Sequence, residues 1–356
     1  MTNIPTEESI TPAWLTEQLN ASGFKGTVTG FTAKRIGTGQ IGKCLRYQLT
    51  IENGDDKTPK SIIAKFPSDD ESSRSTGVLL KNFVKEVSFY RELKSRLTIN
   101  AADCYFADID GDGPDFALLL EDLSPAEQGD QLNGTTPEIA HAAVLQLVGL
   151  HAPSWNDESL RGNDWLGEPS PEGAELTGGL YAGNVDGFVE RYKDKLKDDE
   201  IALIRKLANN KGARGEGLPS PFSLVHVDYR LDNLLIDEST TPARITAVDW
   251  QTITLGSPLA DVAYFIGAGL RADTRRPVEE ELVRTYHTAL TAAGIKDYSW
   301  DACWEDYRRG TFAGIFMAVI ASMMVVRTER GDEMFLTMAR RHARHAIDMK
   351  ADEFLT

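Results

Sequence analysis

The first third of the chain contains short apolar runs of the length of β-strands, separated by turn-forming residues. Residues 27–31 form one run, and residues 33–49 read as two further runs around a glycine-rich turn. Residues 61–67 are mostly apolar with Lys65 inside them, and residues 116–124 form an apolar run that ends in acids. Apolar runs bounded by turn residues are typical of strands. The pattern therefore predicts a β-sheet in this part of the chain.

Helical periodicity dominates outside these runs. Residues 10–20 have helical spacing, with Thr11 as the N-cap and Pro12 in the first turn. Residues 82–93 carry an apolar stripe with the period of an amphipathic helix. The second half of the chain predicts further helices at residues 137–151, 185–196, 199–209, 279–293, 300–326 and 332–354. The combination indicates an α+β protein.

Three short apolar runs interrupt the helical half, at residues 222–225, 234–236 and 245–248. They read as buried strands, and a turn that ends in proline separates the last two. Polar side chains follow or flank each run. A hairpin formed by the last two strands would hold Asp249 near Asn233.

These polar residues have the types and spacing that phosphoryl transfer from ATP requires. The segment from His226 to Asn233 has the pattern HxDxxxxN. Phosphoryl transfer depends on positioning and charge neutralisation, so one acidic group must meet the acceptor hydroxyl while others hold metal against the triphosphate. Mg²⁺ prefers oxygen ligands. We predict Asp228 as the catalytic base and Asn233 and Asp249 as magnesium ligands, with His226 orienting the loop.

At these residues the chain resembles a known group. The segments HVDYRLDN at 226–233, DWQ at 249–251 and GSPLADVAY at 256–264 are similar to motifs of the aminoglycoside phosphotransferase superfamily, in particular its choline and ecdysteroid kinase-like branch. The resemblance implies that a hydroxyl group on a small molecule is phosphorylated, with ATP and Mg²⁺ as cofactors. It also implies that Asp261 braces the catalytic loop. Val227 departs from the family, which usually has glycine at this position.

The same resemblance, which extends from Gly30 to Tyr307, implies a bilobal, protein-kinase-like fold. A small N-lobe over residues 1–123 would bind the nucleotide through an antiparallel sheet and a helix. A larger, mainly helical C-lobe over residues 124–356 would carry the catalytic loop and the acceptor-binding helices.

A glycine-rich turn forms the first part of the predicted nucleotide site. Gly37, Gly39 and Gly42 would let backbone N–H groups approach phosphates without interference from a Cβ atom. An ordinary hairpin turn explains the same glycines. Their position before Lys65 favours the phosphate-binding interpretation.

Lys65 lies in an apolar strand, where an unpaired charge is costly. The resemblance implies that it contacts the α- and β-phosphates and pairs with a glutamate on the following helix. Glu86 lies beside the apolar stripe of that helix and is the predicted partner, with Glu92 as the alternative. If the two charges were unrelated, both would be solvated at the surface.

The apolar run at residues 116–124 resembles the hinge between the lobes of a kinase. There, backbone groups bind the adenine edge, and we assign them to Glu121 and Leu123. A buried strand that runs into a loop fits the same residues.

The composition of the chain restricts the kinds of partner that we expect it to bind. The chain has 356 residues and a formal net charge of −16, which argues against a nucleic-acid partner because a phosphate backbone is held by Lys and Arg. No apolar stretch is long enough for a membrane span, and the first residues lack the features of a signal peptide. We expect a cytoplasmic protein, and the oligomeric state stays open. The three cysteines have no metal-binding spacing.

Two other functions compete with that of a small-molecule kinase. A protein kinase is disfavoured because only eleven residues separate Asp249 from Asp261, too few for an activation segment. A catalytically silent nucleotide-binding module of the pseudokinase type has no need for all of the predicted site residues. The acceptor stays open among aminoglycosides, choline-like alcohols, other sugars, steroid-like alcohols and hydroxyacyl thioesters. A basic group at residues 340–345 reads as a solvated helix end, or else as a site for an anionic acceptor tail.

Overall fold

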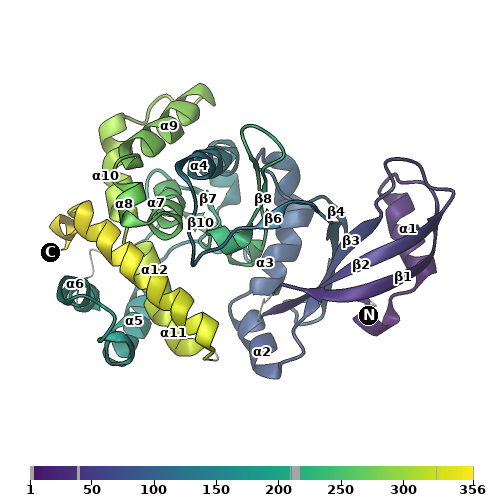
Figure 1. Ribbon diagram of the computed structural model, residues 1–356, viewed down its shortest axis with the longest axis horizontal. Helices are drawn as coiled ribbons and strands as arrows, with labels where there is room; N and C mark the ends of the chain where they lie inside the picture. Colours follow the sequence, from purple (N-terminus) through teal and green to yellow (C-terminus); the bar gives the residue numbers. More distant parts are fainter. Residues whose placement is uncertain (1–3, 38–40, 209, 211–216, 326, 356) are drawn as a thin grey trace. The chain divides into compact units, whose positions relative to one another are not determined.

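The computed structural model describes residues 4–37, 41–208, 210, 217–325 and 327–355 (Figure 1). Contacts divide the chain into two compact units. The N-terminal unit comprises the residues up to Arg96 together with Ala101–Pro125 and Val248–Ile253. The C-terminal unit comprises Leu97–Asn100, Ala126–Ala247 and the residues from Thr254 onward.

A five-stranded antiparallel sheet forms the centre of the N-terminal unit, in the order β1-β2-β3-β5-β4. The strands are β1 Thr27–Ile36, β2 Gly42–Glu52, β3 Ser61–Pro67, β4 Cys104–Ile109 and β5 Phe116–Glu121. Side chains alternate between the two faces of β3. Ile62, Ala64 and Phe66 are buried in a core cluster that includes Leu15 and Leu19. Lys65 therefore points to the opposite face of the sheet.

Helices cover this sheet. Helix α1, Pro12–Ala21, begins at the predicted cap, where the Thr11 side chain accepts from the backbone N–H of Trp14. Helix α2, Glu71–Leu79, is capped by Asp70 and was not predicted. Helix α3, Asn82–Ser88, continues into a π-helical turn at Phe89–Leu93, so the predicted helix at residues 82–93 changes its hydrogen-bonding pattern midway.

The segment Val248–Ile253 packs within the N-terminal unit, although the predicted lobe boundary placed it with the C-lobe. The rings of Phe89 and Trp250 stack with their centroids 3.8 Å apart and their planes 8° from parallel. The Asn82 side-chain amide also donates to the backbone carbonyl of Gln251 at 2.9 Å. These contacts hold the segment that carries Asp249 within the same unit as Lys65.

The C-terminal unit is mainly helical (Figure 1). Its helices are α4 Pro137–His151, α5 Pro171–Tyr192, α6 Asp198–Ala208, α7 Pro258–Gly269, α8 Ala272–Arg275, α9 Glu279–Ala292, α10 Trp300–Gly310, α11 Ala313–Met324 and α12 Glu329–Asp348. Two small antiparallel sheets accompany them: β6 Glu127–Gln128, β8 Leu234–Asp237 and β9 Arg244–Ala247 form one, and β7 Ser223–Val225 and β10 Thr254–Gly256 form the other. Together the two units have the predicted α+β architecture.

Helix α7 lies at the centre of this unit. All of its residues are buried except Ala260, which is half-buried, and α4, α10, α11 and α12 pack on it. Two predicted helices differ most from the structure. Helix α5 begins at Pro171, well before the predicted residue 185, because Ser170 caps it and Pro171 suits its first turn. The predicted helix 300–326 is broken after Gly310, whose backbone approaches Leu259 too closely for a Cβ atom.

No helix in the described part of the chain is both long enough and apolar enough to cross a membrane.

Candidate active site

Lys65 is the centre of a buried charge cluster in the N-terminal unit. Its Nζ atom lies 2.6 Å from Glu86 Oε2 and 2.8 Å from Asp249 Oδ1. Lys65 is only 8% exposed and Glu86 only 2%, so the interpretation of both as solvated charges is wrong. Glu86, the predicted partner, is the glutamate in contact with Lys65.

Burial and charge act in opposite directions on this cluster. Burial disfavours the charged form of Lys65, but the attraction of Asp249 and Glu86 is stronger and holds its pKa well above the usual value. Burial raises the pKa of Glu86 to about 7, against the attraction of Lys65. Lys65 is therefore cationic at neutral pH.

Two of the three predicted glycines lie in the described residues, and Gly39 lies outside them. Gly37 has φ of +69°, a left-handed conformation that glycine adopts without steric cost. A Cβ atom at Gly42 would lie 2.9 Å from Cε of Lys65. Gly42 thus leaves the room that the Lys65 side chain occupies.

The predicted hinge residues lie at the end of β5. Glu121 is the last residue of this strand, and its N–H donates to the carbonyl of Asp103 at 2.8 Å. Its own carbonyl is the backbone group that could accept from an adenine amino group. Leu123 follows two residues later, outside any regular element.

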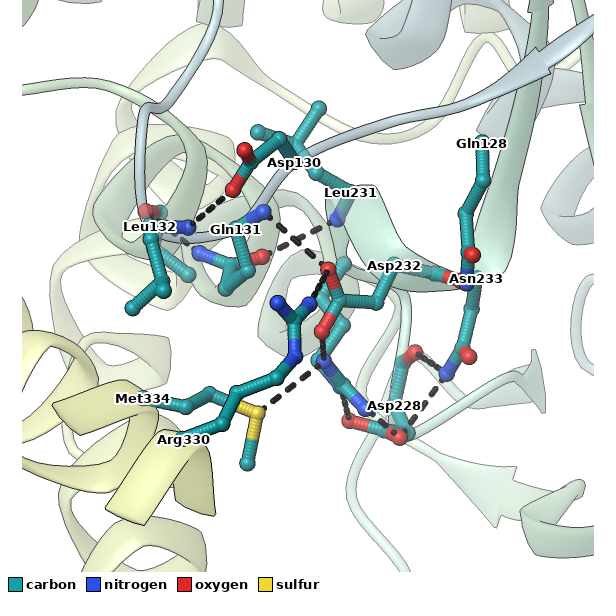
Figure 2. A network of polar contacts seen from close by, with 12 residues as sticks. Gln128, Asp130, Gln131, Leu132, Asp228, Leu231, Asp232, Asn233, Arg330 and Met334 are labelled. Atoms are coloured by element: carbon teal, nitrogen blue, oxygen red, sulfur yellow. Dashed lines mark hydrogen bonds and ion pairs between the residues drawn. The ribbon is translucent and has the colours of Figure 1, made fainter. Parts of the chain in front are cut away.

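Asp228 lies in the C-terminal unit, in the loop after β7, and three side chains donate to its carboxylate. Figure 2 labels one of these donors, Asn233. Arg230 Nε is 3.0 Å and the Tyr264 hydroxyl 2.9 Å from Oδ1. Asn233 Nδ2 is 2.8 Å from Oδ2 and 2.9 Å from the backbone carbonyl of Asp228. The carboxylate is thereby held in one orientation.

The predicted metal ligands have the right chemistry for Mg²⁺. Because Asn233 uses its amide nitrogen on Asp228, its amide oxygen is left as a neutral ligand. The carboxylate of Asp249 supplies a charged oxygen. Within the described residues, no group of three or more His, Cys, Asp or Glu could hold a metal. Each of the two side chains thus offers one oxygen of the kind that Mg²⁺ takes in addition to phosphate and water oxygens.

Asp261 supports the loop from α7. Its Oδ2 accepts the backbone N–H of His226 at 2.6 Å, and its Oδ1 accepts that of Val227 at 2.9 Å. On the other side, His151 Nε2 lies 3.4 Å from Asp261 and His151 Nδ1 lies 2.7 Å from the Tyr286 hydroxyl. His151 is fully buried.

A sequence profile of the ecdysteroid kinase-like family matches residues 37–296, which is most of the chain. The chain belongs to the ecdysteroid kinase-like family. This confirms the resemblance that the motifs indicated.

Known proteins similar to this ecdysteroid kinase-like chain differ widely from it in sequence. Human acyl-CoA dehydrogenase family member 11 is 29% identical over 156 residues, which are 42% of this chain and 16% of that protein. A choline kinase from Cryptosporidium parvum Iowa II is 12% identical, with a TM-score of 0.56 over 98% of this chain and 92% of that one. An ethanolamine kinase from Plasmodium vivax is 10% identical, with a TM-score of 0.51 over 91% and 83%. At these identities the two solved structures show a shared fold.

Sequence reasoning missed two residues that hold the Asp228 carboxylate, Tyr264 and Arg230. Tyr264 lies three residues after Asp261 on α7, so helical spacing could have placed it on the same face. Arg230 lies two residues after Asp228, but no local pattern shows that its side chain folds back onto the loop.

Proposed function

We propose that this chain transfers the γ-phosphoryl group of ATP to a hydroxyl group of a small acceptor. One contact supports the proposal most directly: Lys65, on strand β3, is paired with Glu86 on the following helix α3. In kinases of this fold, a β3 lysine paired with a helix glutamate contacts the phosphates. The predicted glycines, Gly37, Gly39 and Gly42, would approach the same phosphates.

The remaining nucleotide contacts are assigned from position. The carbonyl of Glu121 and the N–H of Leu123 bind the adenine edge. Asn233 and Asp249 hold Mg²⁺, which when bound neutralises negative charge on the phosphate oxygens.

Asp228 meets the acceptor. Arg230, Tyr264 and Asn233 donate to its carboxylate, and the Arg230 Nε–H group is shared between the two oxygens. The acceptor hydroxyl donates to the same carboxylate, which orients the hydroxyl oxygen in line with the γ-phosphorus. As the new P–O bond forms, the hydroxyl proton passes to Asp228 and ADP leaves.

The test is ADP release from MgATP with a panel of hydroxyl compounds, together with the mass of each product. We expect at least one compound to accelerate ADP release and to gain the mass of a phosphoryl group. Asp228→Asn should lower turnover by roughly 10²- to 10⁴-fold while the variant stays folded. If ATP and Mg²⁺ stabilise the protein against heat but no hydroxyl compound raises ADP release, the chain is a silent nucleotide-binding module instead.

A further inference from the structure

The carboxylate of Asp228 shares its guanidinium partner with a second acid (Figure 2). Nε of Arg230 lies 3.0 and 3.2 Å from the two carboxylate oxygens of Asp228. Nη1 of the same guanidinium forms an ion pair with Asp232. One arginine therefore spans both acids of the loop.

Asp232 is held in place to support this arginine. Its Oδ1 accepts the backbone N–H of Gln131 at 3.1 Å, and a second arginine, Arg330, lies 3.9 Å from it. The side chain of Asp232 is 11% exposed, and that of Arg330 is 58% exposed. The negative charge of Asp232 is thus matched by two arginines.

The guanidinium of Arg230 is a permanent cation beside the base. Burial opposes its charge, but Asp228 and Asp232 outweigh this effect and raise its pKa. Its Nη1 also approaches the sulfur of Met334 at 3.5 Å, on α12. Among the contacts of the described residues, Nη2 carries none and can still donate.

A third acid, Asp130, belongs to the same network, but its carboxylate accepts from its own loop. Its Oδ1 receives the backbone N–H groups of Leu132 and Asn133, at 2.8 and 3.2 Å. The Asn133 side chain donates to the other oxygen at 2.6 Å.

We propose that Arg230 sets the charge class of the acceptor, so that this kinase selects hydroxyl compounds with no cationic group next to the reacting hydroxyl. The hydroxyl must reach Asp228, and a positive group a few bonds away would then lie near the Arg230 guanidinium. Like charges at such distances repel strongly where water is partly excluded. Although the whole chain carries a net charge of −16, the carboxylates of Asp228 and Asp232 are already paired with Arg230, and that of Asp130 accepts from its own loop.

This inference rests on the proposed function, and its test uses pairs of alcohols that differ mainly in charge. Choline is compared with its carbon isostere, in which a tert-butyl group replaces the trimethylammonium group, and glucosamine is compared with glucose. The measured quantity is the ratio of kcat/KM for the neutral member to that for the cationic member. These pairs are assayed beside the acceptor panel with the full chain.

In the wild type we expect this ratio to favour the neutral member by on the order of tenfold or more. Arg230→Gln leaves Asp228 and Asp232 without their shared cation, so the ratio should move toward the cationic member by a similar factor. Arg230→Lys keeps the charge and should keep the ratio, even if kcat falls because the bidentate geometry is lost.

Two further variants separate charge from folding. Asp232→Asn removes a negative charge and should move the ratio in the opposite direction from Arg230→Gln. Arg330→Gln removes an exposed arginine and should move the ratio less than Arg230→Gln. Heat stabilisation by ATP and Mg²⁺ shows that each variant remains folded.

The two levels of the proposal fail differently. If no hydroxyl compound of any charge raises ADP release, the proposed function is wrong. If cationic alcohols are the preferred acceptors of the wild type, or if the ratio is the same in Arg230→Gln, the kinase assignment stands and the role given to Arg230 is overturned.

Discussion

The carboxylate of Asp261 accepts the backbone N–H of Val227 at 2.9 Å, and it does so while Val227 is held at φ of +70°. A β-branched residue avoids this left-handed region because its Cβ atom approaches the backbone carbonyl. Hydrogen bonds to a charged acceptor are among the stronger ones in proteins. Asp261 therefore maintains a loop conformation that the valine side chain opposes.

Replacement of Val227 by glycine tests this strain. Relief of the left-handed conformation is worth about 1–2 kcal/mol, and the greater freedom of glycine in the unfolded chain offsets about 0.5–1 kcal/mol of it. We expect Val227→Gly to raise the free energy of unfolding slightly, by up to about 1 kcal/mol. Urea denaturation measures the change. Val225→Gly, in the buried strand β7, is the control and should destabilise; a similar loss in both variants would contradict the strain.

Asp261→Asn should destabilise the protein by roughly 1–3 kcal/mol, because one backbone N–H of the loop would lose its acceptor and face an amide donor. The carboxylate is 2% exposed, so water cannot replace it. Turnover should fall as well, since the loop carries Asp228. Urea denaturation and ADP release are compared with those of Asp273→Asn, an exposed position. Equal stability of the two variants would show that Asp261 does not hold the loop.

Lys65→Met should remove nucleotide binding and lower stability. Loss of one member of a buried ion pair typically costs about 3–5 kcal/mol. The cost should lie toward the lower end, because Glu86 has a pKa of about 7 and can take up a proton when its cation is removed. Thermal denaturation with and without MgATP measures both effects. Lys60→Met, at an exposed position, should retain the stabilisation by MgATP.

Gly314 and Gly183 form a matched pair for packing. A Cβ atom at Gly314 would lie 2.1 Å from Nε2 of the buried His342, whereas a Cβ atom at Gly183 would meet nothing within 4 Å. Gly314→Ala should therefore destabilise by about 1–3 kcal/mol or more. Gly183→Ala, on the exposed side of α5, should be neutral or stabilising by up to about 1 kcal/mol. Differential scanning calorimetry ranks the two; a tolerated alanine at 314 would mean that His342 can move aside.

Stability should fall as the pH drops below about 6.5, the usual pKa of histidine. Burial lowers the pKa of His342 well below that value, and the neighbouring His345 and Arg341 act in the same direction. The unfolded chain then binds a proton that the folded chain does not, so this contribution is complete above pH 6.5 and is lost on acidification. The loss is at most about 1.4 kcal/mol per pH unit for each such group.

Urea midpoints measured between about pH 8 and about pH 5 would show the slope of stability against pH. In His342→Leu the slope should be smaller, because one of the histidines that resist protonation is gone. An unchanged slope would assign the acid sensitivity to other groups. The same burial corrects the expectation for residues 340–345, since His342 and His345 are both fully buried and not part of a solvated helix end.

The sequence alone determined the features that short-range patterns encode. A short apolar run predicted a buried strand around Lys65, and helical spacing predicted Glu86 on the next helix. The HxDxxxxN spacing lies within one loop, so the contact of Asn233 with Asp228 is a local consequence of five residues of chain. The α+β class followed from the same periodicities, and the motifs were enough to indicate the family that the profile confirmed.

Only the tertiary structure decided which distant residues support these groups. Tyr264 reaches Asp228 from a helix thirty-six residues away, and the stacking of Trp250 on Phe89 joins residues far apart in the chain. His342 is buried because Gly314 on another helix leaves space for its ring. Such pairings depend on how whole elements pack, and packing is fixed by the sum of many weak contacts that no local pattern contains. The sequence therefore indicated the candidate reacting groups, whereas tertiary packing determined which side chains hold them in place.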